Sequence, residues 1–151
     1  GVKRVREEWK EKNPDSDVQG VLDETYGRSL MKQGDFSGAR AAFEEVLKNP
    51  KTERSETAAR SQFLLAETYL TEKKYEEATR EFLKVDSLYR FPVWQARALF
   101  QAGSCQQELK DYKGAIQSYE LLLKNWPDNE QASGAKERLE VLRKLVESPA
   151  S

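Results

Sequence analysis

The sequence lacks the residue types that enzymes and metalloproteins use most often. It contains no histidine and a single cysteine, Cys105. The chain therefore has no imidazole to act as a general base or metal ligand, and it cannot form an internal disulfide. It also has no glycine-rich phosphate loop and no cluster of metal ligands. Cys105 falls in the middle of an expected helix with no evident base, where a small buried thiol is ordinary. We therefore expect no catalysis, no cofactor and no metal.

A strong charge of either sign is also absent. The 25 basic and 26 acidic residues leave a formal net charge of −1, so no overall field attracts nucleic acid or an anionic membrane. The basic segment at residues 2–6 is followed at once by acidic residues, unlike the basic, aromatic-lined stripes that read RNA. No apolar run is long enough to span a bilayer. We expect neither nucleic-acid binding nor membrane insertion.

One pattern occurs three times in the chain. An aromatic residue, an alanine three positions later and an aromatic residue four positions after that recur at Phe36/Ala39/Phe43, Tyr75/Ala78/Phe82 and Tyr112/Ala115/Tyr119. The copies are offset by 39 and then 37 residues at all three positions. Self-similarity at this length indicates a helical solenoid. A hydrophobic content of 38% suits an elongated stack in which each repeat buries one face.

The repeats predict an all-α fold: a right-handed α-α superhelix of three helix pairs, with a leading helix and a C-terminal capping helix. Residues 1–14 form the leading helix, which is either the remnant of an earlier repeat or a frayed leader. Residues 15–127 form the three repeats, residues 128–147 the capping helix and residues 148–151 a disordered tail. Within the repeats, the apolar periodicity predicts helices at 17–33, 36–48, 53–72, 74–89, 92–109 and 111–125.

Local signals support these boundaries. Ser16 to Gln19 has the form of a capping box, Gly34 provides a left-handed exit from a helix, and Asp35 is a good N-cap for the next helix. Pro92 suits a first helical turn. Small residues should allow the two helices of a pair to cross closely, at Gly27 with Ala39, Ala66 with Ala78 and Gly103 with Ala115. The capping helix should carry one apolar stripe, formed by Ala132, Ala135, Leu139, Leu142 and Val146.

These residues resemble the tetratricopeptide repeat, whose pattern includes W-x2-L-G-x2-Y, then A-x3-F, then P. The resemblance covers about residues 17–127 and implies a noncatalytic adaptor for protein–protein interaction. The Trp position of the pattern is absent, because it is occupied by Asp23, Gln62 and Leu99. The A-x3-F part is met by Ala39/Phe43, Ala78/Phe82 and Ala115/Tyr119, and the closing proline by Pro127.

The repeats are longer than the usual 34 residues. Such long repeats resemble those of bacterial envelope proteins, including the lipoprotein of the outer-membrane assembly machine and the periplasmic protein that binds the Tol system. This narrower resemblance favours a periplasmic or envelope-associated location over a cytoplasmic one.

The family resemblance also implies a binding site, because the first helices of tetratricopeptide pairs line a concave groove. We expect Phe63 beside Phe100 as an apolar shelf, and Arg60 beside Arg97 as donors to a carboxylate or a peptide carbonyl. This chemistry suits an acidic, aliphatic peptide. Alternatively, the arginines pair with local acids such as Glu56 or Glu67, and the phenylalanines pack between repeats. The expected groove residues are Arg28, Arg60, Phe63, Glu67, Arg97, Phe100 and Ser104.

Some members of the family hold the terminal carboxylate of a chaperone tail with lysine and asparagine side chains. At the corresponding places this chain has Glu24, Arg28, Glu67, Arg97 and Gln101, so we do not expect a clamp of that kind.

A second class of function is self-assembly, as a structural module of a larger bacterial envelope protein. The leading helix carries a narrow apolar stripe of Val2, Val5 and Trp9, which could pair with another copy of the chain at the end of the solenoid. Light scattering over a concentration series separates a monomer from such a dimer, and Trp9→Glu would abolish a dimer built on that stripe.

Overall fold

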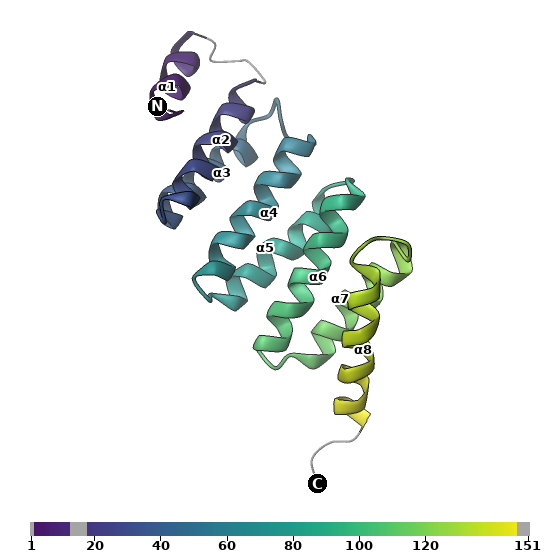
Figure 1. The fold of residues 1–151 in the computed structure, drawn as a ribbon. Helices are drawn as coiled ribbons and strands as arrows, with labels where there is room; N and C mark the ends of the chain where they lie inside the picture. Colours follow the sequence, from purple (N-terminus) through teal and green to yellow (C-terminus); the bar gives the residue numbers. More distant parts are fainter. Residues whose placement is uncertain (1, 13–17, 148–151) are drawn as a thin grey trace. The chain divides into compact units, whose positions relative to one another are not determined.

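The computed structural model describes residues 2–12 and 18–147, and every regular element in this part of the chain is an α-helix. Figure 1 labels these helices along the chain. No helix in the described ranges is both long and apolar enough to cross a membrane. The helices are α1 Val2–Lys12, α2 Val18–Lys32, α3 Phe36–Lys48, α4 Glu56–Thr71, α5 Tyr75–Leu88, α6 Pro92–Glu108, α7 Tyr112–Asn125 and α8 Ala132–Glu147.

The observed helices follow the predicted ones, and the largest differences are at two helix starts. α4 begins three residues later than expected, because Ser55 caps it by accepting a hydrogen bond from the Ala58 N–H at 3.1 Å. α8 begins at Ala132 because the preceding residues form a turn, in which Asn129 Oδ1 accepts from the Gln131 N–H at 2.8 Å. The capping box predicted around residues 16–17, the tail at 148–151 and the Trp9 side chain lie outside what the structure describes.

Three loops between helices contain a residue in the left-handed conformation. Gly34 has a φ of 82°, as predicted for the end of α2. The equivalent residues of the later loops are Lys73 and Lys110, with φ values of 61° and 62°, where a side chain costs roughly 1–2 kcal/mol. Asp35 and Asp111 then cap α3 and α7 by accepting backbone hydrogen bonds at 2.9 and 3.0 Å. These loops set the short connections within each helix pair.

The helices fall into two compact units, residues 1–72 and 73–151. In unit 1, α2 packs against α1, α3 and α4, and α3 also packs against α4 (Figure 1). Its core contains Leu30, Ala39, Phe43 and Leu65. The Phe43 ring, the second aromatic residue of the repeat pattern, is fully buried.

In unit 2, α6 packs against α5 and α7, and α7 also packs against α8 (Figure 1). The core cluster around α6, α7 and α8 includes Leu99, Tyr119, Leu122, Leu139 and Leu142. In both units the small residue of the first helix makes room for an aromatic ring of the second. A Cβ on Gly103 would lie 2.5 Å from Cζ of Tyr119, and one on Gly27 would lie 2.5 Å from Cε1 of Phe43. The predicted close crossings of Gly27 with Ala39 and of Gly103 with Ala115 stay predictions.

The capping helix α8 buries most of its predicted stripe. Ala135 and Leu142 are fully buried. Val146, which we expected in the same stripe, is 43% exposed. Two further aliphatic side chains of α8, Val141 and Leu145, are 58% and 51% exposed. The outer side of α8 therefore remains partly apolar.

Candidate functional site

In unit 1, the most unusual feature is a pair of adjacent buried carboxylates on α2. Asp23 and Glu24 are each only 2% exposed. Arg6 of α1 donates through Nε to Asp23. Arg60 of α4 donates through Nε to both carboxylate oxygens of Glu24, at 3.0 and 2.9 Å. A buried carboxylate is tolerated when it is paired and hydrogen-bonded. Arg6 of α1 and Arg60 of α4 therefore offset the cost of burying the two carboxylates of α2.

The expected groove residues of unit 1 divide by exposure. Arg28 is 58% exposed and its Nη1 lies 3.8 Å from Glu24 Oε1, a weak contact. Arg60 pairs with the acid Glu24, as the alternative expectation of pairing with acids allows. Phe63 is only 6% exposed, and its ring offers little surface to a ligand. Glu67 is half-buried. In this unit the structure brings Arg28 and Arg60 together around one carboxylate.

A third arginine of unit 1, Arg40, is also paired with a carboxylate. The Arg40 side chain is 13% exposed and its Nη1 lies 2.6 Å from Glu72 Oε1. The same nitrogen donates to Thr68 Oγ1 at 3.2 Å, and the guanidinium lies 4.5 Å from the centre of the Tyr69 ring. Arg6, Arg40 and Arg60 thus each have a carboxylate partner.

In unit 2, the three expected residues lie on one side of α6. Arg97, Phe100 and Ser104 are spaced by three and four residues, and each is partly exposed while Leu99 and Ala102 are fully buried. Arg97 is 43% exposed, lies over the Trp94 ring at 5.1 Å and reaches Glu130 only at 4.0 Å. This side of α6 is therefore open in part and carries a cation next to an aromatic ring.

The side chain that joins these residues comes from α8 and was missed by sequence reasoning. The Arg138 guanidinium lies 4.6 Å from the centre of the Phe100 ring. Its Nη1 donates to Ser104 Oγ and, at 3.1 Å, to the Tyr119 hydroxyl. That hydroxyl in turn donates to Gln107 Oε1 at 2.6 Å. The structure thus brings Phe100 and Ser104 together around a half-buried arginine.

The sequence did contain one signal for Arg138. It lies three residues after Ala135 and four before Leu142, next to the predicted apolar stripe of α8. A long side chain at the edge of such a stripe can bury its stem along the core and extend its charged end. The pattern could not show which residues of α6 and α7 it would meet.

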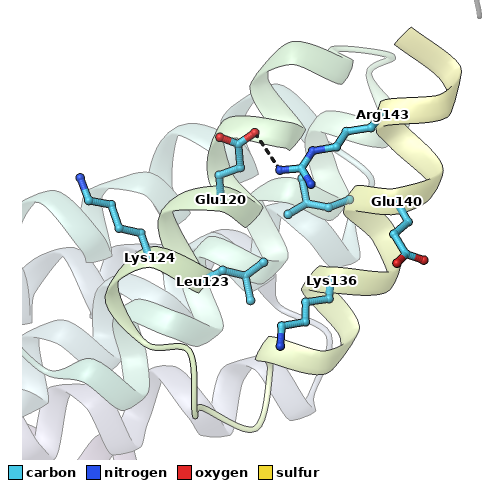
Figure 2. A pocket seen from close by; sticks show the side chains of 7 residues that line it. Glu120, Leu123, Lys124, Lys136, Glu140 and Arg143 are labelled. Atoms are coloured by element: carbon cyan, nitrogen blue, oxygen red, sulfur yellow. Dashed lines mark hydrogen bonds and ion pairs between the residues drawn. The ribbon is translucent and has the colours of Figure 1, made fainter. Parts of the chain in front are cut away.

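A shallow groove of about 510 Å³ lies between α7 and α8. Figure 2 shows Leu123 between the two helices and the Arg143 side chain reaching from α8 to Glu120, 3.5 Å away. Both members of this pair are about half exposed, with relative exposures of 52% and 51%, so it contributes little to stability. Basic and acidic side chains nearly balance in the lining, which consists of Glu120, Leu123, Lys124, Lys136, Leu139, Glu140 and Arg143.

Two titratable groups of unit 2 have shifted pKa values. Burial raises the pKa of the Cys105 thiol to about 11, so the thiol stays protonated and unreactive near neutral pH. Burial also raises the pKa of Asp86, although the Gln95 amide and the nearby Arg90 act in the opposite direction. The Gln95 amide lies 3.3 Å from Asp86 Oδ1. Both shifts follow from burial and local packing.

Comparison with protein families matches two tetratricopeptide repeat models, one to residues 26–87 and one to residues 97–129. Together these matches cover more than half of the chain, and the chain therefore belongs to the tetratricopeptide repeat family. This family is a protein-interaction fold without catalytic function of its own. A comparison with curated proteins finds no matching relative.

Solved structures with the same fold include three domains from eukaryotes. The N-terminal domain of stress-induced protein-1 from C. elegans has a TM-score of 0.69 and 22% identity, covering 82% of this chain and 96% of that one. The second tetratricopeptide domain of human RPAP3, solved with the HSP70 peptide SGPTIEEVD, has a TM-score of 0.64 and 22% identity, covering 84% and 97%. The Arabidopsis OM64 domain has a TM-score of 0.63 and 18% identity, covering 83% and 98%.

The family models confirm the predicted family, and the solved structures confirm the all-α solenoid class. The narrower resemblance to bacterial envelope proteins stays a prediction. The expected neighbours Arg60 with Arg97, and Phe63 with Phe100, join residues of different units, and they also stay predictions.

Proposed function

We propose that this chain is a noncatalytic adaptor that binds an acidic, aliphatic peptide segment of a partner protein on the exposed side of α6. The observation that carries the proposal is the side of α6 formed by Arg97, Phe100 and Ser104. These residues are partly exposed on a helix whose other side is fully buried. An exposed cation beside an aromatic ring suits a carboxylate next to an aliphatic side chain.

Relatives of the same fold support this chemistry. The human RPAP3 domain was solved with a peptide that combines an isoleucine and a valine with three acids, SGPTIEEVD. Of the two expected groove arginines of unit 1, Arg28 is exposed, whereas Arg60 is already bound to Glu24. We therefore place the proposed site in unit 2. A single short site of this kind suggests a dissociation constant of about 1–100 μM.

The test is selection of random nonapeptides by phage display on the full chain. The expected result is enrichment of peptides that contain both acidic and aliphatic residues. An enriched peptide should then bind Arg97→Glu at least about tenfold more weakly than the wild type in fluorescence anisotropy, because this change reverses a charge at the site. Lys113→Glu is the matched control, an exposed lysine on α7, and should bind normally. Enrichment without acids, or equal loss in both variants, would refute the proposal.

A second candidate function is self-assembly through the terminal helices. Val5 of α1 is 54% exposed, and Val141 and Leu145 of α8 lie one turn apart and are more than half exposed. Aliphatic side chains on both terminal helices could join copies of the chain head to tail. In light scattering over a concentration series, the wild type should then grow in mass. Val141→Glu with Leu145→Glu should stay monomeric, whereas Leu121→Glu on α7 should not change assembly. A constant monomer mass would exclude this function.

A further inference from the structure

Arg138 differs from the other arginines that are buried or half-buried in the described part of the chain. Arg6, Arg40 and Arg60 each lie against a carboxylate, and Arg97 reaches the Glu130 carboxylate at 4.0 Å. Arg138 is half-buried, yet both of its hydrogen-bond partners are neutral hydroxyl groups, and it forms no ion pair with any described residue. Removing a cation from water has a cost that neutral partners offset only in part. A carboxylate at this position would offset that cost.

The geometry leaves one edge of the guanidinium free. Nη1 is used by Ser104 and Tyr119. Nε and Nη2 donate to no described residue, and the Arg138 side chain is only partly buried. The Nε and Nη2 protons lie side by side along one edge of the planar group, which is the edge that binds a carboxylate through two parallel hydrogen bonds.

The site is also fixed in advance. Phe100 lies against one face of the guanidinium at 4.6 Å, and Ser104 and Tyr119 hold its far end. The Tyr119 ring is fully buried and its hydroxyl is anchored by Gln107. An arginine held in this way loses little side-chain freedom on binding. Arg97 stands one turn before Phe100 on α6 and adds a second cation with only a weak contact at 4.0 Å.

From these observations we infer that Arg138 is the carboxylate-binding residue of this chain, with Phe100, Ser104 and Tyr119 as the side chains that position it. The ligand group is a peptide carboxylate, from an aspartate or glutamate side chain or from a C-terminus. The inference rests on the proposed function and deepens it, because it names the anchor and the group that the anchor binds.

The direct test uses glutarate, a small dicarboxylate, as the probe. In the uniformly ¹⁵N-labelled full chain, the Nε–H signal of Arg138 is identified by its disappearance in Arg138→Lys. Addition of glutarate in the millimolar range, against chloride at equal ionic strength, should shift this signal saturably. The Nε–H signal of Arg143, an exposed arginine on the same helix that faces Glu120, should barely move. Absence of a saturable shift at Arg138, or an equal shift at Arg143, would overturn the inference.

Inorganic phosphate distinguishes the chemistry of the anion. A stronger response of Arg138 to phosphate than to glutarate at equal charge concentration would overturn the assignment to a carboxylate. A response to glutarate combined with no enrichment of acidic peptides in phage display would leave this site standing and remove the proposed function, so the two failures can be told apart.

Peptide variants then distinguish the two sources of the carboxylate. The probe is SGPTIEEVD, compared with its C-terminal amide and with the peptide in which both glutamates are replaced by glutamine. Loss of the Arg138 shift with the amide assigns the C-terminal carboxylate, and loss with the glutamine peptide assigns a side chain.

Arg138→Gln should weaken binding of the active peptide at least about tenfold. Arg138→Lys should have an intermediate effect, because lysine keeps the charge but cannot form two parallel hydrogen bonds to a carboxylate. Arg143→Gln should bind normally. Normal binding by a folded Arg138→Gln would refute the role of Arg138.

Discussion

Replacing Gly103 by alanine would place a methyl group against the ring of Tyr119. The added Cβ would lie 2.5 Å from Cζ, 2.6 Å from Cε1 and 3.0 Å from Cδ1 of that ring. The ring is fully buried, and its hydroxyl is bound to Gln107 and Arg138, so it cannot turn aside freely. The clash must therefore be relieved by moving α6 away from α7 or by breaking the hydroxyl contacts.

The size of the effect follows from three contributions. Overpacking in a core costs about 1–3 kcal/mol. Disturbing the hydrogen bonds of the Tyr119 hydroxyl lowers the free energy of unfolding by about 1 kcal/mol more. The higher helix propensity of alanine raises it by about 1 kcal/mol. The last two nearly cancel. We expect Gly103→Ala to lower the free energy of unfolding by about 1–3 kcal/mol, measured as a lower midpoint in urea denaturation followed by circular dichroism.

Two controls isolate the ring as the cause. Gly134→Ala places its Cβ 3.1 Å from Cε2 of Phe100, a half-buried ring that can move by a few tenths of an ångström, and should be close to neutral. In the background of Tyr119→Leu, the added Gly103→Ala should cost much less than it does in the wild type. The reasoning fails if Gly103→Ala is as stable as the wild type, or if its cost is unchanged when the ring is gone.

Three further predictions concern charge, backbone strain and pH. Arg60→Met should lower the free energy of unfolding by about 2–3 kcal/mol, because it strips the buried Glu24 carboxylate of its main partner, and adding Glu24→Met should recover most of this loss in urea denaturation; a double variant as unstable as the single one would contradict the argument. Lys110→Gly removes a side chain from a left-handed backbone position, so it should raise the free energy of unfolding by about 0.5–1 kcal/mol and with it the melting temperature. The control Lys113→Gly inside α7 should lower the free energy of unfolding by about 1 kcal/mol. Equal effects of the two changes would show that the backbone at Lys110 is not strained. Burial raises the pKa of the folded Cys105 thiol from 9.0 to about 11, so the unfolded chain loses this proton first. The stability due to the protonated thiol is therefore complete below pH 9 and lost toward pH 11. The free energy of unfolding of the wild type, minus that of Cys105→Ala, should fall as the pH rises through this window. A difference that does not change with pH would show that the thiol is not shielded from solvent.

The sequence alone determined the helices and the family. The triplet Tyr112, Ala115 and Tyr119 and its two earlier copies predicted the helix pairs, and α3 begins and ends where the pattern placed it. Helix periodicity, caps and left-handed exits depend on residues that are close in the chain, as at Gly34 and Asp35. Such signals can be read without knowing which helices become neighbours.

The tertiary structure alone decided the partners of the charged side chains. Arg60 and Glu24 are 36 residues apart in the chain, and Arg138 and Ser104 are 34 apart. A long arginine side chain can reach in several directions, and its choice depends on which acids and hydroxyls the packed helices bring within hydrogen-bond distance. For this reason the sequence placed Arg60 among the candidate groove residues and overlooked Arg138, whereas the packed helices gave a carboxylate to the first and left the second without one.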